Sequence, residues 1–156
     1  MSDRPHAPPP LHLAEHPFFR EMDPDFLDLL KDKVHERPYH TGDLVVREGE
    51  IADEFSLIYS GKVALEIGVA DRPRTTIQTL GPGEVVGWSW LAPPYRWRFD
   101  ARALKPTRTL ALTAPRLRAL LESRPADGYQ FLMRLLPVIA ERLENTRLQL
   151  LDLYGV

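Results

Sequence analysis

Cysteine is absent from this chain of 156 residues, and its absence excludes several kinds of chemistry. Without a thiol the protein has no disulfide, no thiolate metal site and no cysteine nucleophile. Long apolar runs are missing too: no stretch approaches the length of a bilayer span, and the first residues, MSDRPHAPPP, lack the apolar region of an export signal. We therefore expect a cytoplasmic protein that has no membrane partner.

A strong charge of either sign is also lacking, because 20 basic and 22 acidic residues leave a formal net charge of −2. This balance gives no general reason to expect binding to nucleic acid or to an anionic membrane. HLAEH at residues 12–16 formally matches a zinc pattern, but Pro17 follows at once and leaves its helix too short. No acid–base pair or phosphate loop of the kinds that enzymes use is evident either. We expect no enzyme activity, no catalytic residue and no metal ligand.

The residues that are present change their period twice along the chain. Residues 1–10 carry four of the 15 prolines and predict a disordered tail. Residues 11–33 have the pattern of two short helices, and residues 38–113 hold short stretches rich in Val, Ile, Leu and Thr between glycine-containing turns. Residues 114–156 are helical in pattern again. The predicted fold is mainly β with flanking helices: an eight-stranded jelly roll or β-roll within 11–113, preceded by short helices and followed by a long C-terminal helix.

The long C-terminal helix carries an apolar seam at heptad spacing. The seam residues are Leu132, Leu136, Ile139, Leu143, Thr146, Leu150 and Leu153. Such a seam is typical of a two-helix coiled coil, so we expect a homodimer; a stripe packed on the chain's own roll is the alternative. Pro137 lies between seam positions and predicts a bend in this helix.

Over residues 16–153 the sequence resembles the cyclic-nucleotide-binding domain family, which includes catabolite activator protein and kinase regulatory subunits. The resemblance lies in HPFF, DPDFLDLL, YHTGDLVVREGEIADEFSLIYSGKVAL and LGPGEVVG, the last of which matches the glycine-rich approach to the family's phosphate-binding cassette. It implies a cassette in which backbone amides and an arginine hold a cyclic phosphate while a glutamate bonds the ribose. In the family's transcription factors a helix-turn-helix domain follows the seam helix. This chain ends at LLDLYGV, so we expect no direct DNA binding.

The predicted cassette departs from the family at both of these side chains. Trp88 follows Gly87, where the resemblance implies the glutamate, and Trp97 stands at the position of the arginine. In a regular strand Arg96 and Arg98 face away from the side that Trp97 faces, and a one-residue bulge would bring one of them in. The indoles either stack on a flat ligand or fill the interior of the roll. The candidate ligand-binding residues are Gly87, Trp88, Ser89, Trp90, Leu91, Arg96, Trp97 and Arg98.

Two functions remain open on these grounds. The first is a regulatory sensor domain that binds a small ligand and signals through its C-terminal helix to a protein partner. The resemblance implies cAMP or cGMP as that ligand. The second is a ligand-free dimeric scaffold or regulatory subunit whose pocket is filled by tryptophans.

Overall fold

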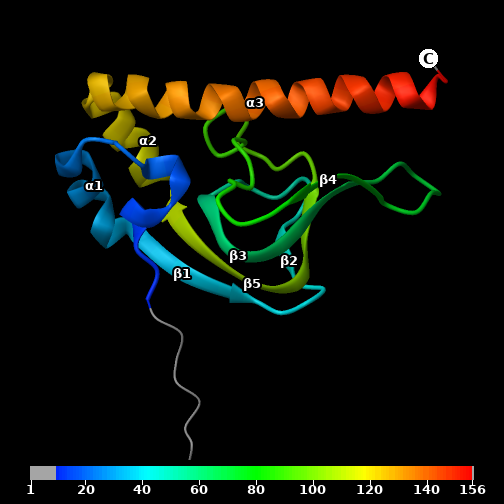
Figure 1. Ribbon diagram of the computed structural model, residues 1–156, viewed down its shortest axis with the longest axis horizontal. Coiled ribbons are helices and arrows are strands. Elements are labelled where there is room, and N and C mark those ends of the chain that lie inside the picture. Colours follow the sequence, from blue (N-terminus) through cyan, green and yellow to red (C-terminus); the bar gives the residue numbers. More distant parts are fainter. Residues whose placement is uncertain (1–9, 156) are drawn as a thin grey trace, which may run out of the picture.

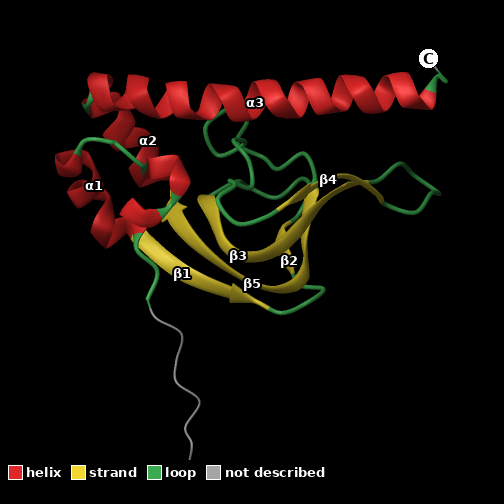
Figure 2. Ribbon diagram, viewed as in Figure 1, coloured by secondary structure: helices red, strands yellow, loops and turns green. Residues whose placement is uncertain are grey.

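The computed structural model describes residues 10–155 and consists of an antiparallel β-roll with helices at one end and along one side (Figures 1 and 2). Except for Pro10, the predicted tail lies outside the described residues. The helical elements are η1 (Leu13–Glu15), η2 (Pro17–Phe19), α1 (Pro24–Leu30), η3 (Lys31–Lys33), α2 (Ala114–Ser123) and α3 (Pro125–Leu153). The strands are β1 (Val34–Tyr39), β2 (Leu44–Val46), β3 (Glu54–Ile67), β4 (Thr75–Leu80) and β5 (Asp100–Thr113). The strands lie in the order β1-β5-β3-β4, and β2 also pairs with β5.

The mainly β fold with short N-terminal helices and a long C-terminal helix is confirmed, but the count of eight strands is wrong, since the described residues form five. Ser60 and Gly61 have the composition of one of the expected turns but form a bulge, because β3 continues through them while its register against β5 shifts. Gly61 has φ 104°, and an added Cβ would come within 2.7 Å of Thr107 atoms. A bulge bends a strand without ending it, so one long strand replaces two short ones.

Local sequence accounts for the helix boundaries. The side chain of Asp23 accepts a hydrogen bond from the backbone N–H of Asp25 at 3.0 Å, and Pro24 occupies the first position of α1. Helix α3 begins with Pro125 and continues through Pro137, so this proline does not end the helix. At about 1.5 Å per residue, its 29 residues extend for about 43 Å, along the whole roll and beyond α2 (Figure 1).

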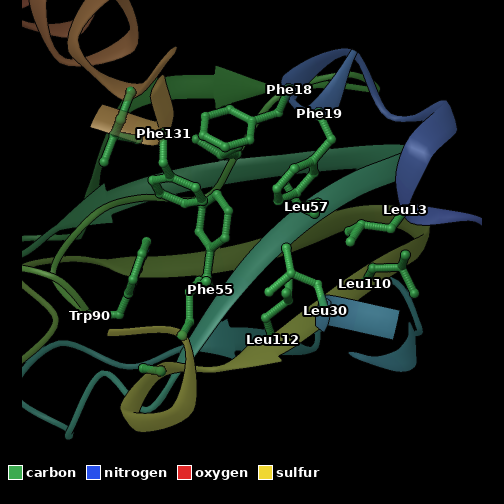
Figure 3. Close-up of a cluster of buried hydrophobic side chains, with 14 of the residues drawn as sticks. Leu13, Phe18, Phe19, Leu30, Phe55, Leu57, Trp90, Leu110, Leu112 and Phe131 are labelled. Carbon is green, nitrogen blue, oxygen red and sulfur yellow. The ribbon is translucent and has the colours of Figure 1, made fainter. Parts of the chain in front are cut away.

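Two apolar clusters hold these elements together. The larger lies between the N-terminal helices, one face of the sheet and the start of α3, and its aromatic centre is Phe18, Phe19, Phe55, Trp90 and Phe131 (Figure 3). The ring centroids of Phe55 and Phe131 are 5.5 Å apart. The smaller cluster fills the inside of the roll and consists of Ile58, Val63, Leu65, Leu80, Val86 and Ala101, with Phe99 packed against it. Apolar side chains therefore pack against both faces of the sheet.

None of the helices within residues 10–155 is both long and apolar enough to cross a membrane.

Candidate functional site

The candidate cassette is the segment between β4 and β5, and backbone hydrogen bonds fix both of its ends to the roll. At its start, Val86 N–H donates to the Ser56 carbonyl at 3.0 Å. At its end, Trp97 N–H donates to the Glu50 carbonyl at 3.0 Å and Gly49 N–H donates to the Trp97 carbonyl at 2.8 Å. The cassette therefore lies between the sheet and α3, where the loops are drawn in Figure 2.

Gly87, Trp97 and Phe99 meet inside the cassette. Trp97 is 5% exposed, and the centroid of its ring is 5.7 Å from that of Phe99. A Cβ added at Gly87 would lie 3.0 Å from Cζ of Phe99 and 3.1 Å from Cζ3 of Trp97. Both rings therefore lie close to Gly87, and a larger residue at this position would require them to shift. Phe99 was not among the predicted residues, although its spacing of two from Trp97 in an extended segment places both on one face.

Trp90 belongs to the same large core as Trp97 but packs on other rings. It is fully buried, and its ring centroid is 4.8 Å from that of Phe55 and 5.7 Å from that of Phe131 (Figure 3). Its indole N–H donates to the Gly87 carbonyl at 3.0 Å, which fixes the turn that Ser89 shares. Ser89 is half-buried in that turn. Trp90 therefore anchors the cassette to the start of α3.

Trp88 and Leu91 face α3 rather than the inside of the roll. Together with Ala92 they line a groove of 250 Å³ against Leu132, Met133, Leu135, Leu136 and Ile139. The Leu91 N–H donates to the Trp88 carbonyl at 2.9 Å, so a single turn presents both side chains to the helix. Since Trp88 and Trp97 lie in different environments, the two positions where the resemblance implied ionic groups no longer share one pocket.

Arg96 and Arg98 are both exposed, so no bulge brings either of them into the roll. Arg96 Nη1 donates to the Gly49 carbonyl at 2.9 Å, and the two arginines line a depression of 410 Å³ with Glu48, Gly49, Pro94 and Trp97 on the outer side of the cassette. Both guanidinium groups therefore lie away from the place where Trp97 and Phe99 approach Gly87.

A second space beside Trp97 is acidic. A pocket of 240 Å³ includes the carboxylates of Glu50, Asp53 and Glu54 but only one guanidinium, that of Arg37. Arg37 Nε donates to Oε2 of Glu54 at 2.8 Å, and this hydrogen bond raises the pKa of Arg37. With its one cation already paired, the pocket repels an anion.

Arg142 was also missed by the sequence interpretation. It lies on α3, is 8% exposed, and its Nη1 donates to the carbonyl of Val86 at 2.7 Å; its Nη2 donates to that of Val85. The guanidinium carbon is 5.3 Å from the centroid of the Trp88 ring, close enough for a cation–π contact. The only signal in the sequence was its spacing of seven from the buried Leu135, which places both on one helical face.

The predicted seam is largely exposed, although Leu132, Leu136 and Ile139 also line the groove beside Trp88. Leu132, Leu136, Leu143, Leu150 and Leu153 are each more than half exposed, whereas Phe131 and Leu135 are buried against the roll. Most of the stripe is therefore not covered by the roll, although Ile139 packs against the core. Within residues 10–155, one face of α3 is bound to the roll and the seam leucines leave an apolar face largely exposed.

An antiparallel roll, a cassette between its fourth and fifth strands and a long helix behind it define a β-roll of the regulatory type. The family model of the cyclic nucleotide-binding domain matches residues 36–124, and the chain belongs to that family, as its sequence predicts. It is 27% identical over 141 residues to the CRP-like cAMP-activated global transcriptional regulator of Mycobacterium tuberculosis, covering 90% of this chain and 61% of that protein.

Solved structures are similar to this chain in fold. The catabolite activator protein of Thermus thermophilus is 29% identical, with a TM-score of 0.69, over 89% of this chain and 63% of that one. The N-terminal domain of a transcriptional regulator from Streptomyces coelicolor A3(2) is 27% identical, with a TM-score of 0.64, over 88% and 94%. The chain spans about three-fifths of the length of the curated relatives it matches.

Proposed function

We propose that this chain is a dimeric regulatory module whose roll is closed by its own aromatic side chains and which acts without a cyclic nucleotide in that roll. The observation that carries the proposal is the contact of Trp97 and Phe99 with the backbone of Gly87. In the family, as the resemblance implies, a cyclic phosphate takes this place. Even an added methyl group at Gly87 would meet these two rings at 3.0 and 3.1 Å, so a phosphate at this place would require the rings to move.

Electrostatics supports the same choice. A phosphate diester in the interior needs a cation, because a charge-assisted contact contributes about 1.5–3 kcal/mol and an unpaired buried anion is strongly disfavoured. Arg96 and Arg98 lie outside, and the acidic pocket beside Trp97 carries Glu50, Asp53 and Glu54. The sensor function predicted from the sequence would need one of these arginines to move inward and an indole to move out.

The exposed seam of α3 is the proposed dimer interface. A heptad seam in which five leucines are each more than half exposed is typical of a helix that packs on a second helix. A second copy of the chain offers the same spacing, so we propose a homodimer through α3, and a protein partner that reads its position.

The first experiment is isothermal titration of the purified protein with cyclic AMP, cyclic GMP and cyclic dinucleotides. We expect no binding heat from any of them and no change in tryptophan emission. Micromolar or tighter binding, with an emission change, would instead favour the sensor function. As a matched control, the double variant Trp88→Glu, Trp97→Arg restores the pair that the resemblance implies, and removal of the Trp97 ring frees space beside Gly87. If this variant gives binding heat and the unmodified protein does not, the two indoles account for the lack of binding.

The dimer is tested with two substitutions of the same kind on the same helix. Leu143 and Leu148 are both 51% exposed, but only Leu143 belongs to the seam. Leu143→Glu places a charge in the proposed interface and should convert the protein to a monomer in sedimentation velocity, whereas Leu148→Glu should remain a dimer. Equal sedimentation of the two variants would contradict a seam dimer.

A further inference from the structure

The half of α3 beyond Pro137 is held on the roll in an unusual way. The buried residues of α3 are Asp127, Gly128, Phe131, Leu135 and Arg142. Every fully buried apolar side chain of the helix therefore precedes Pro137, and the single buried residue after it is a charged one. Val138 and Ile139 add only partial burial. Apolar packing fixes the first half of the helix, together with the Arg134 guanidinium, which donates to the Phe18 and Arg20 carbonyls. The second half has little apolar packing of this kind.

Long polar side chains replace that packing. Arg142 donates to the carbonyls of Val86 and Val85, and Gln149, seven residues further on, donates through Nε2 to the Ile77 carbonyl of β4 at 2.5 Å. The acceptors are backbone oxygens of the roll. Because Val86 N–H in turn donates to Ser56 of β3, the Arg142 contacts join α3 to the sheet through one residue of the chain.

Arg142 makes specific contacts in a buried environment that disfavours the charged form of its guanidinium. Within residues 10–155 no carboxylate oxygen lies close enough to Arg142 to form an ion pair. Burial lowers the pKa of its guanidinium to about 10, and Glu84 and Glu141 oppose this at longer range. The cation remains charged at neutral pH and is satisfied by two carbonyls and the face of Trp88.

Pro137 supplies a natural point of bending between the two halves. A proline inside a helix donates no hydrogen bond to the carbonyl four residues before it, here that of Met133. The helix is thus weakest between its packed first half, which ends at Leu135, and the half that begins with the contacts of Arg142.

We propose that Arg142 is a latch that holds the half of α3 beyond Pro137 against the cassette, with Pro137 as the hinge on which this half moves when the latch opens. The device is independent of any ligand. It goes beyond the proposed function, because it assigns to one side chain the control of where the exposed seam points.

The test measures distances between spin labels in the full-length protein. Because the chain contains no cysteine, two labels can be placed at will. One pair joins Lys105→Cys on β5 to Arg147→Cys beyond the hinge, and the matched control pair joins Lys105→Cys to Gln130→Cys before it; all three positions are exposed. Labelled subunits are diluted with an excess of unlabelled protein so that only distances within one subunit contribute.

Arg142→Met keeps an unbranched apolar stem but removes the guanidinium and its donors. We expect this change to shift and broaden the distance distribution of the 105–147 pair and to leave the 105–130 pair unchanged. Unchanged distributions for both pairs would overturn the latch. A change in both pairs would overturn it too, since the hinge would then not lie at Pro137.

A second variant keeps the test decisive if Arg142→Met does not fold. Arg142→Lys retains the charge, but one ammonium cannot reproduce the two-armed contact with successive carbonyls, so we expect the same shift to a smaller extent. Adding Pro137→Ala should narrow the distribution again by stiffening the hinge. Both measurements are made without nucleotide and within one subunit, so neither the titration nor the sedimentation result affects their outcome.

Discussion

The substitution Trp97→Ala tests most directly whether the roll is closed. The backbone of Trp97 is held by Glu50 and Gly49 independently of its side chain, so truncation should remove the ring without unfolding this segment of the cassette. Burial of about 150–250 Å² of indole at about 25 cal/mol per Å² amounts to about 4–6 kcal/mol. The compactness of the unfolded chain makes that value an upper estimate. Since truncations of buried aromatic residues lower stability by about 3–5 kcal/mol, we expect a loss of that size.

The assay is urea-induced unfolding followed by far-ultraviolet circular dichroism, at one fixed protein concentration because self-association changes apparent stability. Trp97→Phe is the control: it keeps a ring on Gly87 and should lose clearly less. A loss below about 1 kcal/mol for Trp97→Ala would refute the reasoning, because a ring that contributes so little lies in a solvated pocket and not in a packed interior.

Two further outcomes follow from contacts of the described residues. Gly87→Ala should lower the free energy of unfolding by about 1–3 kcal/mol, because its Cβ would meet Phe99 and Trp97 at 3.0 and 3.1 Å. The control Gly81→Ala, whose Cβ would have no atom within 4 Å, should change this free energy by less than about 0.5 kcal/mol. Equal shifts in melting temperature for the two variants would contradict this prediction. Burial lowers the pKa of His16, whose Nδ1 accepts from Phe18 N–H at 3.2 Å while Nε2 donates to the Ile58 carbonyl at 3.0 Å. The stabilisation is therefore complete above the unfolded pKa of 6.5 and declines as the pH falls below it, since the unfolded chain takes up the proton first. His16→Gln should reduce this decline in melting temperature between about pH 7.5 and pH 5.5, and an identical decline in the variant would show that other groups cause it.

The order and type of the elements were predictable from the sequence because hydrophobic period and turn residues are local properties. The long helix could be bounded from Pro125 to about Leu153, and its seam at Leu132 to Leu153 could be identified, because heptad spacing is read along one helix. The strand count was not predictable in this way. Ser60 and Gly61 have the composition of a turn, and whether they form a turn or a bulge depends on the register of β3 against β5.

The candidate site shows the same division more sharply. The sequence by itself determined that the cassette has indoles at positions 88 and 97, where the family resemblance implies ionic groups, and that Arg96 and Arg98 alternate with Trp97. Only the tertiary structure decided that Trp90 and Trp97 join one large core on different rings while Trp88 faces α3, since the turn from Trp88 to Leu91 breaks the strand alternation. It also decided that Arg142 is buried, because the carbonyls that satisfy its charge belong to residues 56 and 57 positions earlier in the chain. Periodicity describes neighbours along one element, whereas burial of a charge depends on acceptors that only folding brings to it.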